Sequence, residues 1–244
     1  MIVIRLGKLD YKKALTIQEE LLALRQQNEI GDCLLLVEHP PVLTIGKSGK
    51  DANITTPKEL LAQAGITIYD VGRGGDVTYH GPGQIVGYPI MHIQASGMGI
   101  KDYVWKVEEV FIRLLAEEYQ ITAHREEKKY TGVWVEDEKI TAIGIAVKRH
   151  VTMHGFAFNV NTNLAHFGWI NPCGIIDKGV TSLQKLLGKE MDFENMNNLV
   201  LKYFCQVFQV QPEFIQSKAE IMKLQEEELN FQDILCLLGL PEKV

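Results

Sequence analysis

The sequence has few cysteines, no long apolar run and no excess of basic residues, and each absence excludes a class of protein. Its four cysteines are spread over 244 residues without a CxxC pair, so we expect neither a zinc site nor a disulfide framework. No stretch approaches the roughly 18 consecutive apolar residues that a membrane-spanning helix needs. The formal net charge of -6 argues against nucleic acid as the main partner, because phosphate binding requires a basic surface.

Targeting and linker signals are also lacking. The first residues, MIVIRLGKLDYKK, turn polar too early for a signal peptide and are not the Arg- and Ser-rich, acid-poor stretch of a transit peptide. We find no internal repeat, low-complexity tract or Pro/Gly/Ser-rich linker. We therefore expect a cytoplasmic protein with one domain over residues 1–244, of which about 215–244 is a helical extension.

The four cysteines differ in their surroundings. Cys33, Cys205 and Cys236 lie in the apolar runs CLLLVE, VLKYFCQVF and DILCLLGL, which predicts that they are buried in the core. Cys173 lies in the polar, turn-rich segment INPCGI. In a reducing compartment a cysteine in such a setting is a candidate working thiol.

Apolar patterning predicts strands in the middle of the chain and helices around them. Helices are expected after Asp10 and from Asp102, because apolar residues recur there three and four positions apart. After the NPCG corner the chain is predicted to be helical to its end. There is no regular β-α-β alternation, which favours an α+β layered domain. Strands are expected at residues 1–5, 33–39, 42–46, 66–73, 84–93, 132–135, 139–149 and 153–162.

A glycine-rich loop lies between two of these strands, in the segment RGGDVTYHGPGQ from Arg73 to Gln84. Glycine lets a ligand approach the backbone closely and leaves N–H groups free to face it. The glycines alone are equally compatible with a tight hairpin. The polar residues beside them favour a binding loop. The pattern is not that of a dinucleotide-binding fold, because no helix follows it.

Lys139 opens the apolar run KITAIGIAVKR. Such a lysine often extends along the surface with its ammonium in water. A desolvated ammonium beside a thiol would instead favour the thiolate. In the same run and in HGFAFN, the small residues Gly144, Ala146, Gly155 and Ala157 leave room above the sheet that an acyl chain would need.

The NPCG corner presents Cys173 rigidly, because Pro172 fixes its own φ and Gly174 frees the next residue. A thiol, a lysine and a loop of small residues together indicate an acyl-transfer site. No HExxH or comparable ligand spacing exists, so no metal is predicted.

Several motifs in this order resemble the lipoyl(octanoyl) transferases, or octanoyl-[acyl carrier protein]:protein N-octanoyltransferases. The similarity covers VEHPPVLTIGKSG, RGGDVTYHGPGQIVGYPI, KITAIGIAVKR, HGFAFNVNTNL, INPCGI and GVTSL. It implies the fold of the biotin and lipoate protein ligase catalytic domains, with a mixed, mostly antiparallel sheet flanked by helices. Nothing is transferred to the stretch after about Phe214.

The resemblance also implies a mechanism. Cys173 would form an octanoyl thioester from octanoyl-acyl carrier protein, and Lys139 would activate the thiol. A lysine of an apo lipoyl domain of a 2-oxoacid dehydrogenase, or of glycine cleavage H protein, would then accept the octanoyl group without ATP or metal. His80 and Tyr88 are expected to be polar groups of the pocket. The acyl pocket would be lined by Arg73, Gly74, Gly75, Asp76, Val77, Thr78, Tyr79, His80, Ala142, Ile143, Gly144, Gly155, Phe156 and Ala157.

Other functions remain open at this point. An ATP-dependent lipoate or biotin protein ligase shares the implied fold, but needs no cysteine and carries an RRxxGGG-type loop that is absent here. A non-catalytic acyl-binding or carrier-binding module would not need Lys139 and Cys173. A cysteine hydrolase would need a His/Asn pair, and no motif places one.

Overall fold

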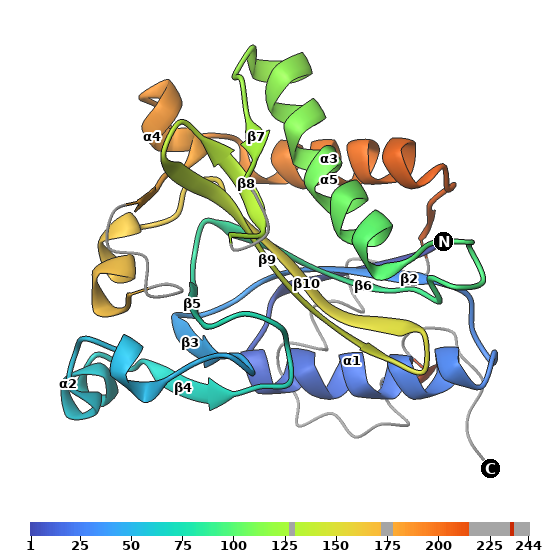
Figure 1. The fold of residues 1–244 in the computed structure, drawn as a ribbon, viewed down its shortest axis with the longest axis horizontal. Helices are drawn as coiled ribbons and strands as arrows, with labels where there is room; N and C mark the ends of the chain where they lie inside the picture. Colours follow the sequence, from blue (N-terminus) through green and yellow to red (C-terminus); the bar gives the residue numbers. More distant parts are fainter. Residues whose placement is uncertain (127–129, 172–177, 215–234, 237–244) are drawn as a thin grey trace.

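The computed structural model describes residues 1–126, 130–171, 178–214 and 235–236. In this part of the chain, a long sheet has helices on both faces and a smaller sheet beside one end (Figure 1). The strands of the long sheet run in the order β12–β1–β2–β6–β10–β9–β8–β7, and β11 pairs with β9. They are β1 (Ile2–Lys8), β2 (Cys33–Glu38), β6 (Gln84–Ile90), β7 (His124–Arg125), β8 (Gly132–Val135), β9 (Glu138–Lys148), β10 (Val151–Asn159), β11 (Gly179–Val180) and β12 (Glu213–Phe214).

Most neighbouring strands in the long sheet are antiparallel. The run from β2 through β6, β10, β9 and β8 to β7 is antiparallel throughout. The parallel pairs are β1 with β2, β1 with β12, and β9 with β11. The predicted mixed, mostly antiparallel sheet is therefore confirmed. As expected for a central strand, β9 pairs with β10 on one side and with β8 on the other.

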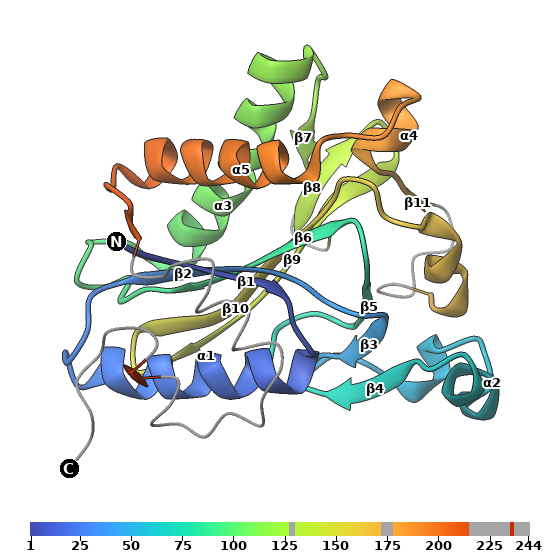
Figure 2. The ribbon, with the colours of Figure 1, turned by 180° about the vertical axis from the view of Figure 1, so that it is seen from behind.

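Helix α1 (Tyr11–Gln26) covers one face of the sheet (Figure 2). The Asp10 carboxylate caps it by accepting from the Lys12 backbone N at 2.8 Å, as the sequence predicted. The predicted apolar stripe packs on the sheet and is fully buried. Its members are Ala14, Ile17, Leu21 and Leu24.

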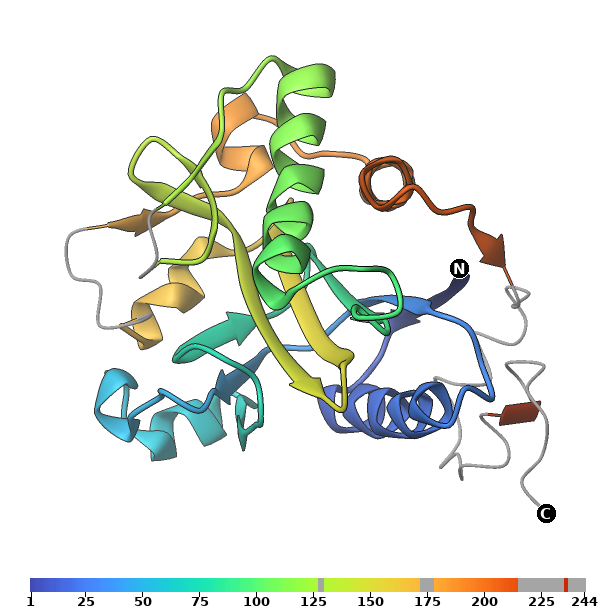
Figure 3. The same cartoon turned by 45° about the vertical axis from the view of Figure 1, so that its right-hand side comes forward.

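Helices α3 (Ile100–Tyr119) and α5 (Phe193–Phe208) cover the opposite face, and α5 is seen end-on in Figure 3. The helix predicted from Asp102 begins at Ile100, because Gly99 is the N-cap and its N–H donates to the Asp102 carboxylate at 2.9 Å. No helix in the described part of the chain is both long and apolar enough to cross a membrane.

The smaller sheet has three strands and lies beside one end of the long sheet. Its order is β4 (Thr67–Asp70), β3 (Val42–Ile45), β5 (Val77–His80), with β3 parallel to β4 and antiparallel to β5. The sequence did not predict β5, because its four residues lie inside the glycine-rich motif. Two 3₁₀ turns, Asp51–Asn53 and Leu164–Trp169, and helix α2 (Lys58–Gln63) lie beside this sheet.

The prediction of helix from the NPCG corner to the chain end is wrong in part. Helices α4 (Leu183–Leu187) and α5 do form, but the short strands β11 and β12 lie before and after them. Their backbone groups pair with β9 and β1, a tertiary preference that local sequence does not carry. The predicted helix at residues 217–230 and most of the extension at 215–244 lie outside the described residues.

The core prediction is confirmed for one of three cysteines. Cys33 is fully buried. Cys205 is only half-buried and Cys236 is exposed, so apolar sequence neighbours overestimated their burial.

Candidate active site

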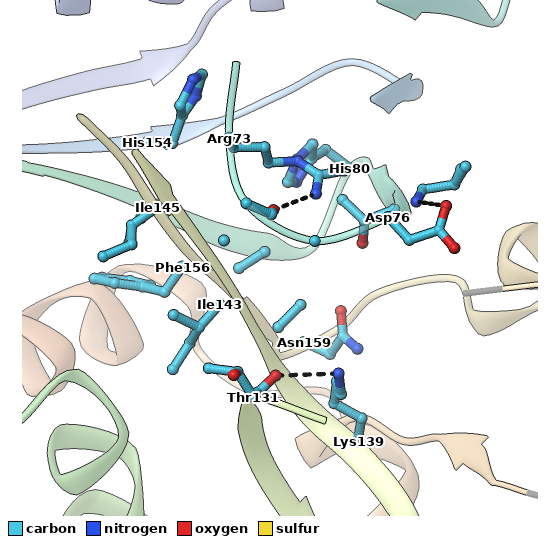
Figure 4. Close-up of a pocket in the computed structure, with 18 of the residues that line it drawn as sticks. Arg73, Asp76, His80, Thr131, Lys139, Ile143, Ile145, His154, Phe156 and Asn159 are labelled. Carbon is cyan, nitrogen blue, oxygen red and sulfur yellow. Dashed lines mark hydrogen bonds between the residues drawn. The ribbon is translucent and has the colours of Figure 1, made fainter. Parts of the chain in front are cut away.

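A cavity of about 270 Å³ lies where strands β9 and β10 meet the glycine-rich loop. Figure 4 shows Lys139 and Asn159 at one end of it and Arg73 and His154 at the other. Its apolar lining comes mainly from Val104, Ala142, Ile143, Ile145, Phe156, Ala157 and Phe167. A concave site with a largely apolar lining and a few polar groups is typical of small-ligand binding.

The glycine-rich loop contacts the outer edge of β9. Strand β8 pairs with β9 only as far as Gly132 opposite Ala142, which leaves the next backbone groups of β9 available on that side. The Gly74 N–H donates to the Ile145 carbonyl at 2.7 Å. Gly75 has a φ of +85°, a conformation that a side chain would strain. These contacts fix the loop as one wall of the cavity.

Arg73 braces this loop from behind. Its guanidinium is buried and donates to the Thr44 carbonyl at 2.6 Å, to the Thr44 hydroxyl and to the Gly74 carbonyl at 3.0 Å. The side chain therefore ties the loop to β3.

The small residues of β9 and β10 do not all create open space. A Cβ at Gly144 would lie 2.9 Å from the Gly74 carbonyl oxygen, and one at Gly155 would lie 2.1 Å from the Gly87 carbonyl oxygen. Gly144 thus permits the loop to approach β9, and Gly155 permits β10 to pack on β6. The expected room above these two glycines is filled by backbone, although both still line the cavity.

Lys139, the second residue of β9, lines one end of the cavity. Its side chain is half-buried, with Nζ 3.2 Å from the Thr131 carbonyl and 4.8 Å from the centroid of the Trp134 ring. The ammonium lies against an aromatic face at the cavity end, an arrangement that stabilises a cation.

Cys173 lies outside the described residues, but both flanking segments are placed. On one side, the Asn171 N–H donates to the Asn53 carbonyl at 2.7 Å. On the other side, Lys178, Gly179 and Val180 line the cavity, and Val180 pairs with Lys139 in register.

A series of hydrogen bonds through two side-chain amides connects Thr181, just after β11, to His80. Asn159 Nδ2 donates to the Thr181 carbonyl at 3.0 Å, so its Oδ1 accepts from Gln84 Nε2 at 2.9 Å. Gln84 Oε1 then accepts from His80 Nδ1 at 2.9 Å. Burial lowers the pKa of His80 to about 3. His80 is therefore a neutral imidazole protonated on Nδ1, with a lone pair on Nε2.

A second buried histidine, His39, is also fixed by hydrogen bonds at both ring nitrogens, one of them to Tyr88. His39 Nδ1 donates to the Leu9 carbonyl at 2.7 Å, so its Nε2 accepts from the Tyr88 hydroxyl at 2.8 Å. Burial lowers the pKa of His39 to about 4 and raises that of Tyr88 well above its usual value. His80 and Tyr88, which both line the cavity, therefore stay neutral near pH 7 beside the Arg73 guanidinium.

Comparison with known proteins shows the family of this chain. Residues 10–205 match the family model for the lipoyl protein ligase A/B catalytic domain. The chain belongs to this family. An octanoyltransferase of Desulforamulus reducens is 58% identical over 218 residues, which cover 89% of this chain and 95% of the relative. An octanoyltransferase of Caldicellulosiruptor saccharolyticus is 57% identical over 225 residues, which cover 91% and 96%.

Solved structures of lipoate and biotin protein ligases share the fold. A crystal structure of lipoate-protein ligase A bound with ATP has a TM-score of 0.71 at 15% identity, and the match covers 98% of each chain. The biotin protein ligase from Aquifex aeolicus in complex with biotin and ATP has a TM-score of 0.53 at 13% identity, covering 85% of this chain and 70% of that one. The predicted likeness to the biotin and lipoate protein ligase fold is confirmed.

Most of the sequence-predicted pocket residues meet at this cavity. Lys139 and Tyr88 line it, and so do all the predicted acyl-pocket residues except Tyr79. The side chain of Tyr79 points to the face of β5 opposite to that of Thr78 and His80. It is fully buried there, and its hydroxyl lies 2.7 Å from His166 Nδ1. Among the described residues, no group of three or more His, Cys, Asp or Glu side chains is placed to hold a metal ion.

Sequence reasoning missed several lining residues. Tyr11, Trp134 and Lys178 line the cavity but lie outside the quoted motifs, and Asn159 lines it from HGFAFN without having been singled out. His154 also lines it, fully buried, with a φ of +57° and an Nδ1 that has no partner among the described residues. The signal for His154 was its place in HGFAFN, where a polar residue interrupts an apolar strand.

Proposed function

We propose that this chain transfers an octanoyl group from octanoyl-acyl carrier protein, through a thioester on Cys173, to a lysine of an apo lipoyl domain or of glycine cleavage H protein. This would be the first step of protein lipoylation. The proposal is supported by family membership and by relatives more than half identical over most of the chain that are named octanoyltransferases.

The single observation that carries the proposal is the position of the two segments beside Cys173. On the N-terminal side of Cys173, Asn171 is hydrogen-bonded to Asn53. On its C-terminal side, the segment from Lys178 to Val180 lines the cavity, and Val180 pairs with Lys139. A lysine ammonium near the thiol would favour the thiolate.

The proposed reaction has two acyl transfers. The Cys173 thiolate attacks the carbonyl carbon of the donor thioester, and the pantetheine thiolate leaves and takes a proton. The neutral amine of the acceptor lysine then attacks the Cys173 thioester. The cysteine leaves as a thiolate and the amine loses a proton, and the proposed role of Lys139 is to help transfer that proton. Exchange of one thioester for another needs no nucleotide, so ATP is not required.

A transfer assay separates this function from its alternatives. With octanoyl-acyl carrier protein and an apo lipoyl domain, octanoyl transfer should proceed equally with and without ATP and Mg²⁺, and free octanoate should be a poor donor. Transfer from free octanoate that depends on ATP would make the chain a ligase. Tight octanoyl binding without transfer would indicate a non-catalytic module.

A further inference from the structure

Asp76 belongs to the glycine-rich loop, but its carboxylate is directed away from the apolar wall of the cavity (Figure 4). Its Oδ1 accepts from the Val77 N–H at 2.7 Å, and its Oδ2 accepts from Asn53 Nδ2 at 2.5 Å. The residue is only 9% exposed. Two hydrogen bonds to one mostly buried carboxylate fix its orientation firmly.

Asn53 holds a second segment at the same time. Its carbonyl accepts from the Asn171 N–H at 2.7 Å. The adjacent residues continue this contact, because Ile54 bridges to Ile170 and the Thr55 N–H donates to the Trp169 carbonyl at 2.9 Å. The segment around Asn53 therefore connects the glycine-rich loop to the chain that leads into the NPCG corner.

We propose that Asp76 and Asn53 are positioning residues that set where the NPCG corner begins relative to the glycine-rich loop. The carboxylate orients Asn53, and the Asn53 backbone orients Asn171, two residues before Cys173. This inference rests on the proposed function, since it assigns a role through the nucleophile at Cys173. The Asp76 carboxylate is directed away from the apolar wall, and Asn53 is not among the residues that line the cavity.

The hydrogen-bond pattern gives a specific exchange test. Each oxygen of Asp76 accepts one bond, so Asp76→Asn can satisfy only one of the two donors. Asn53→Asp places two carboxylates together and loses the donor. In the double variant, an amide at position 76 accepts from Val77 with its oxygen and donates to the carboxylate at position 53. The hydrogen bond between positions 53 and 76 is then restored with donor and acceptor exchanged. The double variant has the same net charge as the parent.

The measurements compare octanoyl-enzyme formation in the parent, both single variants and the double variant. All carry Cys236→Ser, because Cys236 is exposed and would react with thiol reagents. Each single substitution should lower the maximal acylation rate by about tenfold, the loss of one charge-assisted hydrogen bond, with little change in donor KM. The double variant should recover to within about threefold of the parent. Asp51→Asn changes an acidic residue two positions before Asn53, in the exposed Asp51–Lys58 pair. It is the matched control and should match the parent.

The alkylation rate of Cys173 against pH separates positioning from folding and from simple electrostatics. The two single variants change net charge in opposite directions, so a purely electrostatic effect would move the thiol pKa oppositely in the two. Positioning predicts a shift in the same direction in both and its reversal in the double variant. No recovery in the double variant, or losses that only follow a lower melting temperature, would overturn the inference. If the parent itself forms no adduct at Cys173, it is the proposed function that fails.

Discussion

Lys139 is half-buried, with its ammonium between a backbone carbonyl and the face of Trp134. These contacts fit two roles. The lysine could extend past the aromatic ring with its charge toward water, or it could hold its charge beside the thiol of Cys173. The flank containing Val180, which pairs with Lys139, favours the second role.

Lys139→Ala should therefore reduce octanoyl transfer by about a hundredfold or more, the range expected for loss of a proton-transfer or charge-stabilising group. The pH midpoint for alkylation of Cys173 should rise, because the thiolate loses a neighbouring cation. The matched control is Lys185→Ala, which removes an exposed lysine paired with Glu138. An unchanged alkylation midpoint would leave Lys139 as a surface lysine packed on Trp134.

The buried histidines link the site to acid stability. Burial lowers the pKa of His39 and His154 to about 4 and of His80 to about 3. Below the unfolded-state pKa of about 6.5, the unfolded chain binds protons that these folded side chains do not, so stability falls as the pH falls from there toward 4.

His80→Asn should flatten this pH dependence while keeping a donor to Gln84, because the amide Nδ2 takes the place of Nδ1. Urea unfolding between about pH 7 and pH 4.5 should lose up to about 1.4 kcal/mol less stability per pH unit in the variant than in the parent. His150→Gln, at an exposed position, serves as the control and should leave the slope unchanged. Equal slopes for all three proteins would show that His80 titrates normally in the folded state.

At the scale of elements, the glycine-rich loop shows what sequence could and could not predict. Its position beside a binding site followed from glycine density and polar neighbours. Its contact with Ile145 did not, because that contact depends on β8 ceasing to pair with β9 after Ala142. The same holds for Tyr79, whose direction follows from the pairing of β5 with β3. Strand periodicity was readable, but partners and register are tertiary properties.

Because of this geometry, the loop glycines are poor positions for a test of pocket size. A side chain at Gly75 is strained by a φ of +85°, and one at Gly144 would meet the Gly74 carbonyl oxygen. Substitutions there would disturb the loop for any donor. Ala142 is half-buried on β9, lines the cavity and has ordinary strand geometry.

Ala142→Leu should shorten the cavity without displacing the loop. Acylation by an octanoyl donor should fall by about tenfold or more, and acylation by a butanoyl donor much less, since only the longer chain needs the filled volume. Ala62→Leu, the same change at an exposed position of α2, should affect neither donor. Equal losses for both donors would place the acyl chain elsewhere.

At the scale of the whole molecule, the long sheet and the small sheet bring distant segments to one place. The loop from Arg73, the start of β9 and the segment from Lys178 to Val180 are separated by dozens of residues and meet at the cavity. The order of motifs predicted this meeting through family resemblance. The link through Asn53 was not predicted, because nothing in KDANITT distinguishes a connecting segment from an ordinary loop.

The central claim is that Cys173 carries the octanoyl group at this cavity. Its most direct test is the intact mass of the protein after mixing with octanoyl-acyl carrier protein, followed by peptide mapping and by addition of an apo lipoyl domain. The account predicts one octanoyl unit per chain on Cys173, lost as the acceptor gains it, and no adduct in Cys173→Ala. An octanoyl adduct on Cys33, Cys205 or Cys236, or transfer that persists in Cys173→Ala, would contradict it.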